Sequence, residues 1–398
     1  MREHNTEVVV VGAGPAGSIT ALYLAKAGVK VTVIEKRQEI GAPKRCAEGL
    51  GLAAIEEFGF TPHPRWAAQE IGGSFLYSPS MKRVSIESKY KGYVLERKVF
   101  EKFLAAEAIK AGARYIVKAT VTDVIKTDGK VTGVEAEGMD GEFKVHSLMV
   151  IAADGVDSMT AKRAGINTVN KMSDYHSGFQ YEMAGVSADE TKIHLFFGNK
   201  IAPKGYTWIF PKGNTLANVG IGIVGTMSQE GKRAKDLLDD FIANKPQFFK
   251  NASPVEVNSG GIPVDPKFET LVADNFMIVG DAAHQVNPIH GGGIALAMRG
   301  GRIAAEVAAS ALREGNTTKK RLEEYEVLWE QKEGTRLRKL MKLRLFLEKL
   351  DDEELEKLAS VMDSDTVIQL VSGDVQQILK IVMLKAPKLL PLAKKFFD

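Results

Sequence analysis

The stretch from Thr6 to Glu35 constrains the fold of this chain more than any other. It starts with four valines, 8–11, a short apolar run that predicts a strand buried on both faces. A glycine-rich turn, Gly12-Ala13-Gly14-Pro15-Ala16-Gly17, follows at once. A helix closed by Gly28 and a second strand over 29–34 come next. This order predicts a βαβ unit on a parallel sheet.

The glycines of the turn have separate tasks. Gly12 permits a tight turn, Gly14 lets the backbone approach a pyrophosphate, and Gly17 lets the helix pack closely on the strand. Glu35 ends the second strand close to the spacing, about 20 residues, at which an acid accepts a hydrogen bond from an adenosine ribose. An ordinary βαβ turn would leave Glu35 unexplained, so we predict a dinucleotide site.

Composition narrows the class of protein. A chain of 398 residues with 44% hydrophobic residues suits two or three globular domains. The net charge of +3 argues against nucleic acid as the main partner. A single cysteine, Cys46, excludes a disulfide framework and any cluster held by four cysteines of this chain. No residue is assigned as a metal ligand.

The two ends of the sequence bear on location. The N-terminus passes from polar residues straight into the first strand, which predicts no signal peptide, and no apolar run reaches the roughly 18 residues of a membrane span. We therefore expect a cytoplasmic protein. The segment 378–397 holds five lysines and no acid among large apolar residues, including Lys380 and Lys395. It suits basic helices in peripheral contact with anionic lipid, or equally a terminal helix packed on the body.

Two basic positions follow the first βαβ unit. Arg45 and the backbone from Cys46 to Gly49 could lie along a cofactor's pyrophosphate and rings, although a free cysteine is also often a small buried residue. Arg97 is the first residue of a predicted helix, a position that usually favours acidic residues. A phosphate group bound next to it would explain this basic residue. The alternative for Arg97 is a solvated surface residue.

Three regions alternate in hydrophobicity and predict strands. Residues 71–95 predict short antiparallel strands, and 114–125, 131–137 and 143–150 fit a β-meander. Residues 173–262 predict one antiparallel sheet with a cavity on one face, its strands being His176–Ala184, Thr191–Phe197, Gly205–Phe210, Leu216–Val224 and Glu256–Ile262. Tyr206, Trp208 and Phe210 alternate within it, which predicts either an aromatic wall on one face or packing against a helix.

A second cofactor-contacting element is predicted near residue 281. Asp281 follows the buried strand 276–279, and Gly291, Gly292 and Gly293 precede Ile294 at the start of a helix. An acid at a strand's carboxyl end suits a ribityl hydroxyl, and glycines at a helix start let a flat ring approach the backbone.

Over about residues 6–310 the chain resembles flavoproteins of the para-hydroxybenzoate hydroxylase fold. Three motifs in this order carry the resemblance: the glycine-rich turn 12–17 with Glu35, the pair Asp154-Gly155 after a strand, and Gly280-Asp281 before Pro288. Within that group the chain is most similar to the geranylgeranyl reductases, especially the archaeal digeranylgeranylglycerophospholipid reductases. The residues that carry this resemblance are Arg45-Cys46-Ala47-Glu48-Gly49 and Tyr206-x-Trp208-x-Phe210-Pro211, preceded by Pro203.

The resemblance implies an α/β (α+β) architecture in three parts. Segments 1–70, 96–172 and 263–315 would form a Rossmann-like FAD-binding domain, 71–95 and 173–262 an antiparallel-sheet substrate domain, and 316–398 a C-terminal helical region. The residues expected at FAD are Gly12, Gly14, Ala16, Gly17, Glu35, Arg45, Cys46, Ala47, Gly49, Arg97, Val121, Asp281, Gly293 and Ile294. Those expected at the substrate are Pro203, Tyr206, Trp208, Phe210 and Pro211, and the catalytic set is Cys46, Tyr206, Trp208 and Phe210.

The activity implied is FAD-dependent reduction of isolated double bonds in geranylgeranyl chains of archaeal lipid precursors. The first alternative is a flavin monooxygenase acting on an aromatic or lipidic substrate, because the fold supports both. A quinone-linked dehydrogenase is disfavoured by the single cysteine, and a prenyl-lipid carrier with structural FAD stays open. The sequence has no second glycine-rich turn of this kind, so it does not predict a dedicated NAD(P)H domain. Ferredoxin, NAD(P)H and other reductants therefore stay open as the electron donor. Flavin, Cys46 and an ordered water are open as proton donors.

Overall fold

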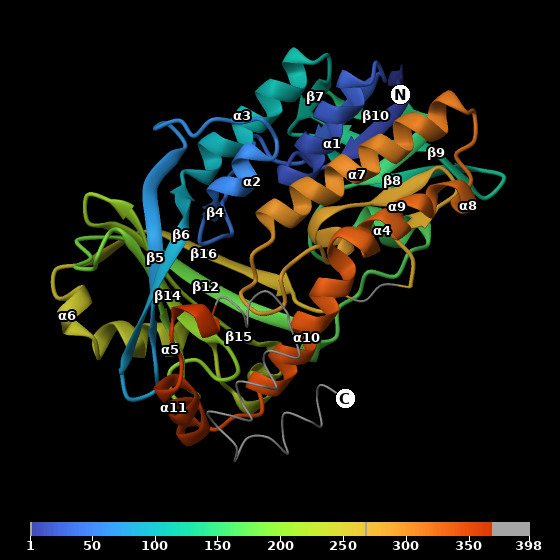
Figure 1. Cartoon of the computed structure of the whole chain (residues 1–398). Helices are drawn as coiled ribbons and strands as arrows, with labels where there is room; N and C mark the ends of the chain where they lie inside the picture. The colour runs from blue at the N-terminus through green and yellow to red at the C-terminus, as the bar shows by residue number, and fades with distance from the viewer. Residues whose placement is uncertain (1, 267–268, 368–398) are drawn as a thin grey trace.

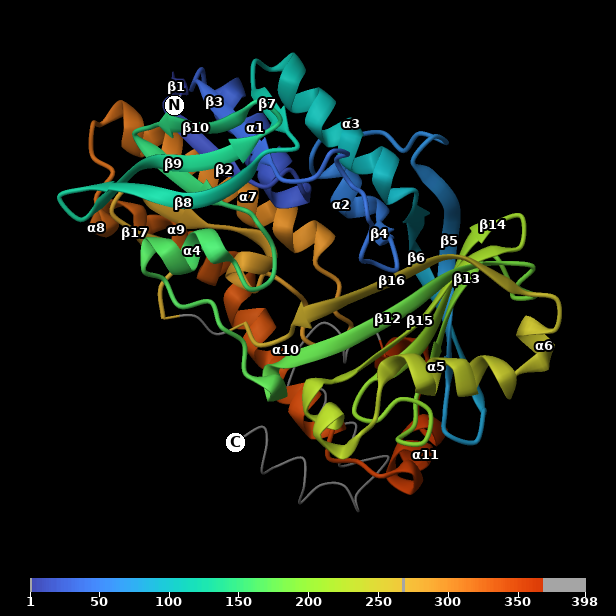
Figure 2. The same ribbon diagram turned by 180° about the vertical axis from the view of Figure 1, so that it is seen from behind.

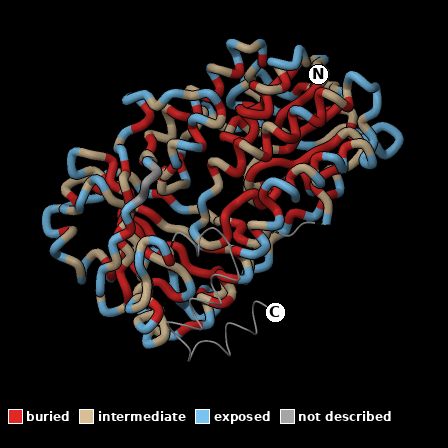
Figure 3. Tube along the Cα trace, in the orientation of Figure 1, coloured by how far each residue is buried: buried red, intermediate tan, exposed pale blue. Residues whose placement is uncertain are grey.

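The computed structural model describes residues 2–266 and 269–367. Figure 1 shows two parts: one around the N-terminal strands, and one around a single large sheet. Helix α10 (Thr335–Leu347) runs from the first part down along the second. Figure 3 shows a buried interior in each part, in agreement with two separate apolar cores.

The first part is built on a six-stranded sheet in the order β17-β18-β11-β2-β3-β7, parallel except for β17. Its strands are β2 (Val8–Val11), β3 (Val31–Glu35), β7 (Arg114–Val117), β11 (Met149–Ala152), β17 (Val272–Ala273) and β18 (Phe276–Ile278). Helices α1 (Pro15–Lys26), α3 (Arg97–Lys110) and α7 (Ile294–Arg313) cover one face (Figure 1). The predicted βαβ unit and its buried valines are confirmed.

The glycine-rich turn is as tight as its sequence predicts. Gly12 has a φ of 103°, in the region that favours glycine. A Cβ on Gly17 would stand 2.0 Å from the carbonyl oxygen of Gly12, so no larger residue fits where helix α1 begins. These two positions bring the N-terminus of α1 against the end of β2.

The predicted meander is partly wrong. A four-stranded sheet in the order β1-β10-β9-β8 covers the other face of the parallel sheet (Figure 2). Its strands are β1 (Arg2–Asn5), β8 (Thr120–Thr127), β9 (Lys130–Gly138) and β10 (Gly141–His146). Segments 114–125 and 143–150 each divide between this sheet and the parallel one. Lys118 adopts a φ of 53° and breaks the first, and the amide of Leu148 turns to the Glu7 carbonyl (3.0 Å) and breaks the second.

The second part is an eight-stranded sheet in the order β16-β12-β15-β14-β13-β5-β6-β4. Its strands are β4 (Gly49–Gly51), β5 (Ala67–Tyr77), β6 (Arg83–Leu95), β12 (Tyr175–Ala184), β13 (Lys192–Phe196), β14 (Tyr206–Gly213), β15 (Leu216–Val224) and β16 (Ser253–Pro263). The five strands predicted within 173–262 are present, but the sheet is not wholly antiparallel, because β13 pairs in parallel with β5. Residues 71–95 belong to two long strands that join this sheet, rather than several short ones.

Helices α5 (Ala234–Ala243) and α6 (Pro246–Phe249) lie on the outer face of the large sheet, as Figure 2 shows. Short helices α2 (Leu52–Glu56) and α4 (Met159–Ala164) belong to the first part. Beyond residue 316 the described chain is mostly helical, as predicted, with α8 (Lys319–Leu322), α9 (Glu324–Trp329), a π-helical turn (Glu330–Gly334), α10 and α11 (Asp352–Ser360).

The basic segment from Lys380 to Lys395 lies outside the described residues, so its predicted contact with a membrane is not addressed by the fold. Among helices within 2–266 and 269–367, none combines the length and the apolar character needed to cross a membrane.

Candidate active site

A cavity of about 910 Å³ lies between the two parts, and its wall is mainly apolar. Its nucleotide side is lined by residues at the start of α1, after β18 and at the start of α7: Gly14, Ala16, Gly280, Asp281, Gly293 and Ile294. Its far side is lined by α10, α11 and the turn after it, with Leu343, Phe346, Leu347, Leu355, Leu358, Ala359 and Met362. Because α11 and the N-terminus of α1 are far apart in Figure 1, the cavity is elongated.

The nucleotide side has room and chemistry for a dinucleotide. A Cβ built on Gly14 would meet nothing within 4 Å, so the backbone there is open to the cavity at the N-terminus of α1. Asp281 also lines the cavity, and no hydrogen bond to its carboxylate occurs among the described residues. Burial raises the pKa of Asp281, and Arg97 opposes that rise. A partly buried acceptor beside open backbone amides fits FAD.

Most of the predicted cofactor residues meet in this wall. Gly14, Ala16, Arg45, Cys46, Ala47, Gly49, Arg97, Asp281, Gly293 and Ile294 all line the cavity. Arg97 is therefore not a solvated surface residue. Its Nε binds Glu101, and its backbone amide donates to Oε1 of Glu48 at 2.7 Å.

Four predicted cofactor residues lie outside the lining of the cavity. Gly12 and Gly17 shape the turn behind it. Glu35 accepts hydrogen bonds from the backbone amides of Ala13 and Arg37, each at 2.8 Å. The amide of Ala119 donates to the Glu35 carbonyl at 3.0 Å, which brings the start of β8, with Val121, next to the end of β3. Contact of Glu35 and Val121 with an adenosine end stays a prediction.

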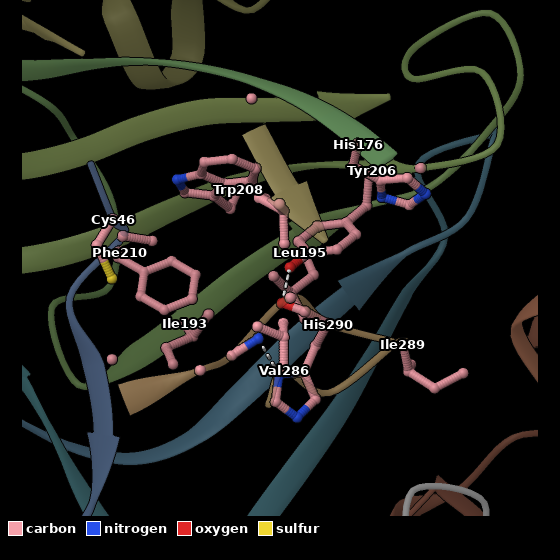
Figure 4. A pocket seen from close by; sticks show the side chains of 18 of the residues that line it. Cys46, His176, Ile193, Leu195, Tyr206, Trp208, Phe210, Val286, Ile289 and His290 are labelled. Carbon is pink, nitrogen blue, oxygen red and sulfur yellow. Dashed lines mark hydrogen bonds between the residues drawn. The ribbon is translucent and has the colours of Figure 1, made fainter. Parts of the chain in front are cut away.

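The aromatic side chains of β14 form one wall of the cavity. Figure 4 shows Tyr206, Trp208 and Phe210 around the same space as Cys46. Trp208 is 7% exposed and lies against strand β15, because a Cβ on Gly220 would stand 2.4 Å from its ring. The alternating side chains of Tyr206, Trp208 and Phe210 therefore form an aromatic wall of the cavity and do not pack against a helix.

Pro203 and Pro211 lie outside the lining of the cavity, so their contact with the substrate stays a prediction. Side chains alternate along a strand, so Pro211 points to the face opposite Phe210. Pro203 precedes the strand and is buried.

Three ionisable groups next to the aromatic wall, Cys46, Tyr206 and His290, are neutral near pH 7. Burial raises the pKa of the Cys46 thiol, and its Sγ accepts a hydrogen bond from the Glu48 amide at 3.1 Å. Burial also raises the pKa of the Tyr206 hydroxyl, which donates to the His290 carbonyl at 2.6 Å. Burial lowers the pKa of the His290 ring to about 4. The middle of the cavity therefore carries no charge on these three groups.

Comparison with known proteins decides the family. Residues 174–262 match the family described as "Geranylgeranyl reductase catalytic domain", and residues 7–63 match "FAD dependent oxidoreductase". The chain is 41% identical to digeranylgeranylglycerophospholipid reductase 1 of Methanothermobacter thermautotrophicus, over 98% of both chains. The chain belongs to the geranylgeranyl reductase family. It is accordingly a flavin-dependent oxidoreductase whose cofactor is FAD.

Solved structures agree with the fold of this geranylgeranyl reductase. A geranylgeranyl bacteriochlorophyll reductase-like protein from Thermoplasma acidophilum superposes with a TM-score of 0.91 and 35% identity, covering 99% of this chain and 100% of that one. A flavin-dependent brominase superposes with a TM-score of 0.76, but at 22% identity over 99% of each chain it shares the fold alone.

Sequence reasoning missed a buried ionic cluster of the reductase beneath the Cys46 loop. Lys44, Glu48 and Lys212 are at most 6% exposed. Oε2 of Glu48 lies 2.8 Å from Nζ of Lys212 and 3.2 Å from Nζ of Lys44, and both lysines also contact Glu182. Polar residues at inward positions of otherwise apolar strands were the available signal, because Lys212 follows Phe210 by two residues on the same strand.

Proposed function

We propose that this reductase saturates the isolated double bonds of geranylgeranyl chains on glycerophospholipid or diphosphate precursors of archaeal membrane lipids. The observation that carries the proposal is the elongated apolar cavity, which joins the nucleotide loops to the leucines of α10 and α11. A long tail needs such a space, whereas a benzoate-sized substrate would need a short polar pocket. The substrate of the Methanothermobacter relative, by its name, is such a lipid.

The residues of the wall divide the work. FAD in its reduced form supplies the hydride when bound. Trp208 and Phe210 hold each double bond in place and exclude water, and both effects lower the barrier to transfer. The electron-rich faces of these rings also favour positive charge developing on the alkene.

Cys46 is the proton donor in this proposal. The Tyr206 hydroxyl directs its proton to the His290 carbonyl. The Cys46 sulfur, in contrast, accepts a hydrogen bond from Glu48 and retains its own proton, because burial keeps the thiol pKa raised. The proton passes to the alkene carbon that does not receive the hydride, and solvent restores the thiol afterwards. Flavin and an ordered water are the competing donors.

The three-part division of the chain also stays a proposal. Segments 1–70, 96–172 and 263–315 would bind FAD, 71–95 and 173–262 would bind the lipid, and 316–398 would form a C-terminal helical region. The lysines of 378–397 would bring the protein to anionic lipid, where each contributes about 1 kcal/mol near the surface. The electron donor, ferredoxin or NAD(P)H, is not assigned.

The proposal is tested by anaerobic reoxidation of photoreduced protein. A digeranylgeranyl glycerophospholipid should return the flavin spectrum to its oxidised form, and the same lipid with saturated chains should not. A carrier that holds FAD structurally would give no reoxidation with either lipid. Equal reoxidation by both lipids would also refute alkene reduction.

A further inference from the structure

Two buried side-chain amides stand between the aromatic wall and the loop that carries Cys46. Gln180 on β12 is 4% exposed and Asn218 on β15 is fully buried. Gln180 pairs across β12 and β15 with Gly220, the residue on which Trp208 lies. Neither amide has a role in the activity described so far.

The side-chain amide of Gln180 binds both the Trp208 indole and the loop that carries Cys46. Its Oε1 accepts a hydrogen bond from Nε1 of Trp208 at 2.9 Å. Its Nε2 donates to the backbone carbonyl of Cys46 at 3.0 Å and to Oδ1 of Asn218 at 3.2 Å. Both ends of the amide are therefore used, and a rotation of the side chain would leave buried polar groups unpaired.

Asn218 ties this amide to the rest of the loop. Its Nδ2 donates to the carbonyl of Ala47 at 3.2 Å and to Oε2 of Glu48 at 2.7 Å. Glu48 is in turn bound by Lys212 and Lys44. The loop expected at the flavin and the tryptophan expected at the alkene thus share one continuous hydrogen-bonded network.

We propose that Gln180 is a positioning residue of the reductase, which holds the Trp208 indole and the Cys46 loop in one fixed geometry. This rests on the proposed function, in which Trp208 meets the alkene and the loop meets the flavin. Transfer between two bound groups depends steeply on their separation and orientation. An apolar side chain would fill the space as well, but it would leave the indole and the loop free to move relative to one another.

A readout independent of catalysis comes from the three tryptophans of the chain, Trp66, Trp208 and Trp329. In full-length protein labelled with ¹⁵N at tryptophan, Trp208→Phe assigns the indole signal of Trp208. Gln180→Leu should make that N–H exchange with solvent at least about tenfold faster, because its acceptor is lost. Gln180→Glu should keep the slow exchange, since a carboxylate still accepts. Unchanged signals from the other two tryptophans report an intact fold.

Kinetics complete the test. With FAD bound, Gln180→Leu should slow lipid-dependent reoxidation about tenfold at saturating lipid, with little change in the lipid concentration needed. Gln180→Glu keeps the indole acceptor but cannot donate to Cys46, so it should slow the step while sparing the Trp208 signal. Thr207→Val is the matched control, because Thr207 is fully buried on β14 and faces away from the cavity.

A double-mutant cycle tests whether the two residues act as a unit. Gln180→Leu combined with Trp208→Phe should be no slower than the slower single variant. Additive effects, or a Gln180→Leu protein with wild-type indole exchange and wild-type reoxidation, would overturn the proposal. If no geranylgeranyl lipid reoxidises even the wild type, the proposed function is wrong, and indole exchange alone then decides whether Gln180 holds Trp208.

Discussion

The indole ring of Trp208 lies so close to Gly220 that a Cβ on the glycine would stand 2.4 Å from Cζ2 of the ring. Gly220→Ala must therefore tilt the indole away from β15. We expect lipid-dependent reoxidation to slow about tenfold or more, because the alkene surface moves relative to the flavin. FAD occupancy should stay at the wild-type level. Stopped-flow reoxidation measures the first effect and the visible spectrum the second, and wild-type reoxidation by Gly220→Ala would show that the ring does not position the substrate.

Asp281 should have opposite effects on stability and on cofactor binding. Burial raises its pKa, so the folded apoprotein binds this proton more readily than the unfolded chain does. The carboxylate consequently lowers stability as the pH rises from its ordinary value, near 4, through the raised pKa.

Asp281→Asn should make the apoprotein more stable at neutral pH and weaken FAD binding about 10- to 100-fold, through loss of a hydrogen bond to a charged acceptor. Wild-type affinity should itself fall as the pH drops through the raised pKa, while that of Asp281→Asn should not. Thermal unfolding of apoprotein and flavin titration measure the two effects. Equal FAD affinity in both proteins would remove Asp281 from the cofactor site.

The buried cluster around Glu48 should be essential for stability. Burial opposes its charge, but Lys212 and Lys44 hold the pKa of Glu48 below its usual range. Glu48→Gln leaves two buried lysines without this partner and should cost about 3–5 kcal/mol in urea unfolding at pH 7. The cost should shrink as the pH falls through the range where Glu48 takes up its proton.

The exposed pair of Arg233 and Asp236 provides the comparison for Glu48. Asp236→Asn should cost less than about 1 kcal/mol. Similar costs for the two variants would mean that solvent reaches the Glu48 cluster.

The far side of the cavity should select for chain length. Ala359 of α11 lines the cavity, whereas the next residue, Ser360, is exposed. Ala359→Phe fills the space that a long tail would occupy, so reoxidation by geranylgeranyl lipids should slow at least about tenfold while a short geranyl analogue reacts normally. Ser360→Phe adds the same ring to the surface and should change neither. Equal slowing of the long and short substrates by Ala359→Phe would place the tail elsewhere.

The sequence predicted the parts of this site that depend on local spacing. The valines before Gly12 and the alternation of Tyr206, Trp208 and Phe210 each follow from one stretch of chain with one periodicity. The strand breaks at Lys118 and Leu148 were missed, because each depends on a backbone hydrogen bond to a distant strand or loop.

Gln180 and Asn218 were missed for a similar reason. They lie 38 residues apart on neighbouring strands and meet a loop more than 130 residues earlier. Only the register of β12 against β15 brings them together with Cys46. A polar residue at an inward position shows that a partner is required, but the sequence does not identify the partner.

The chemistry of the product tests the central claim most directly. Photoreduced protein is mixed with a digeranylgeranyl glycerophospholipid, once without oxygen and once with it, and the recovered lipid is analysed by mass spectrometry. Alkene reduction predicts a lipid that has gained two hydrogens for each double bond reacted, formed without oxygen and carrying no added oxygen atom in either sample. A lipid that is unchanged without oxygen and hydroxylated with it would contradict the account and identify a monooxygenase.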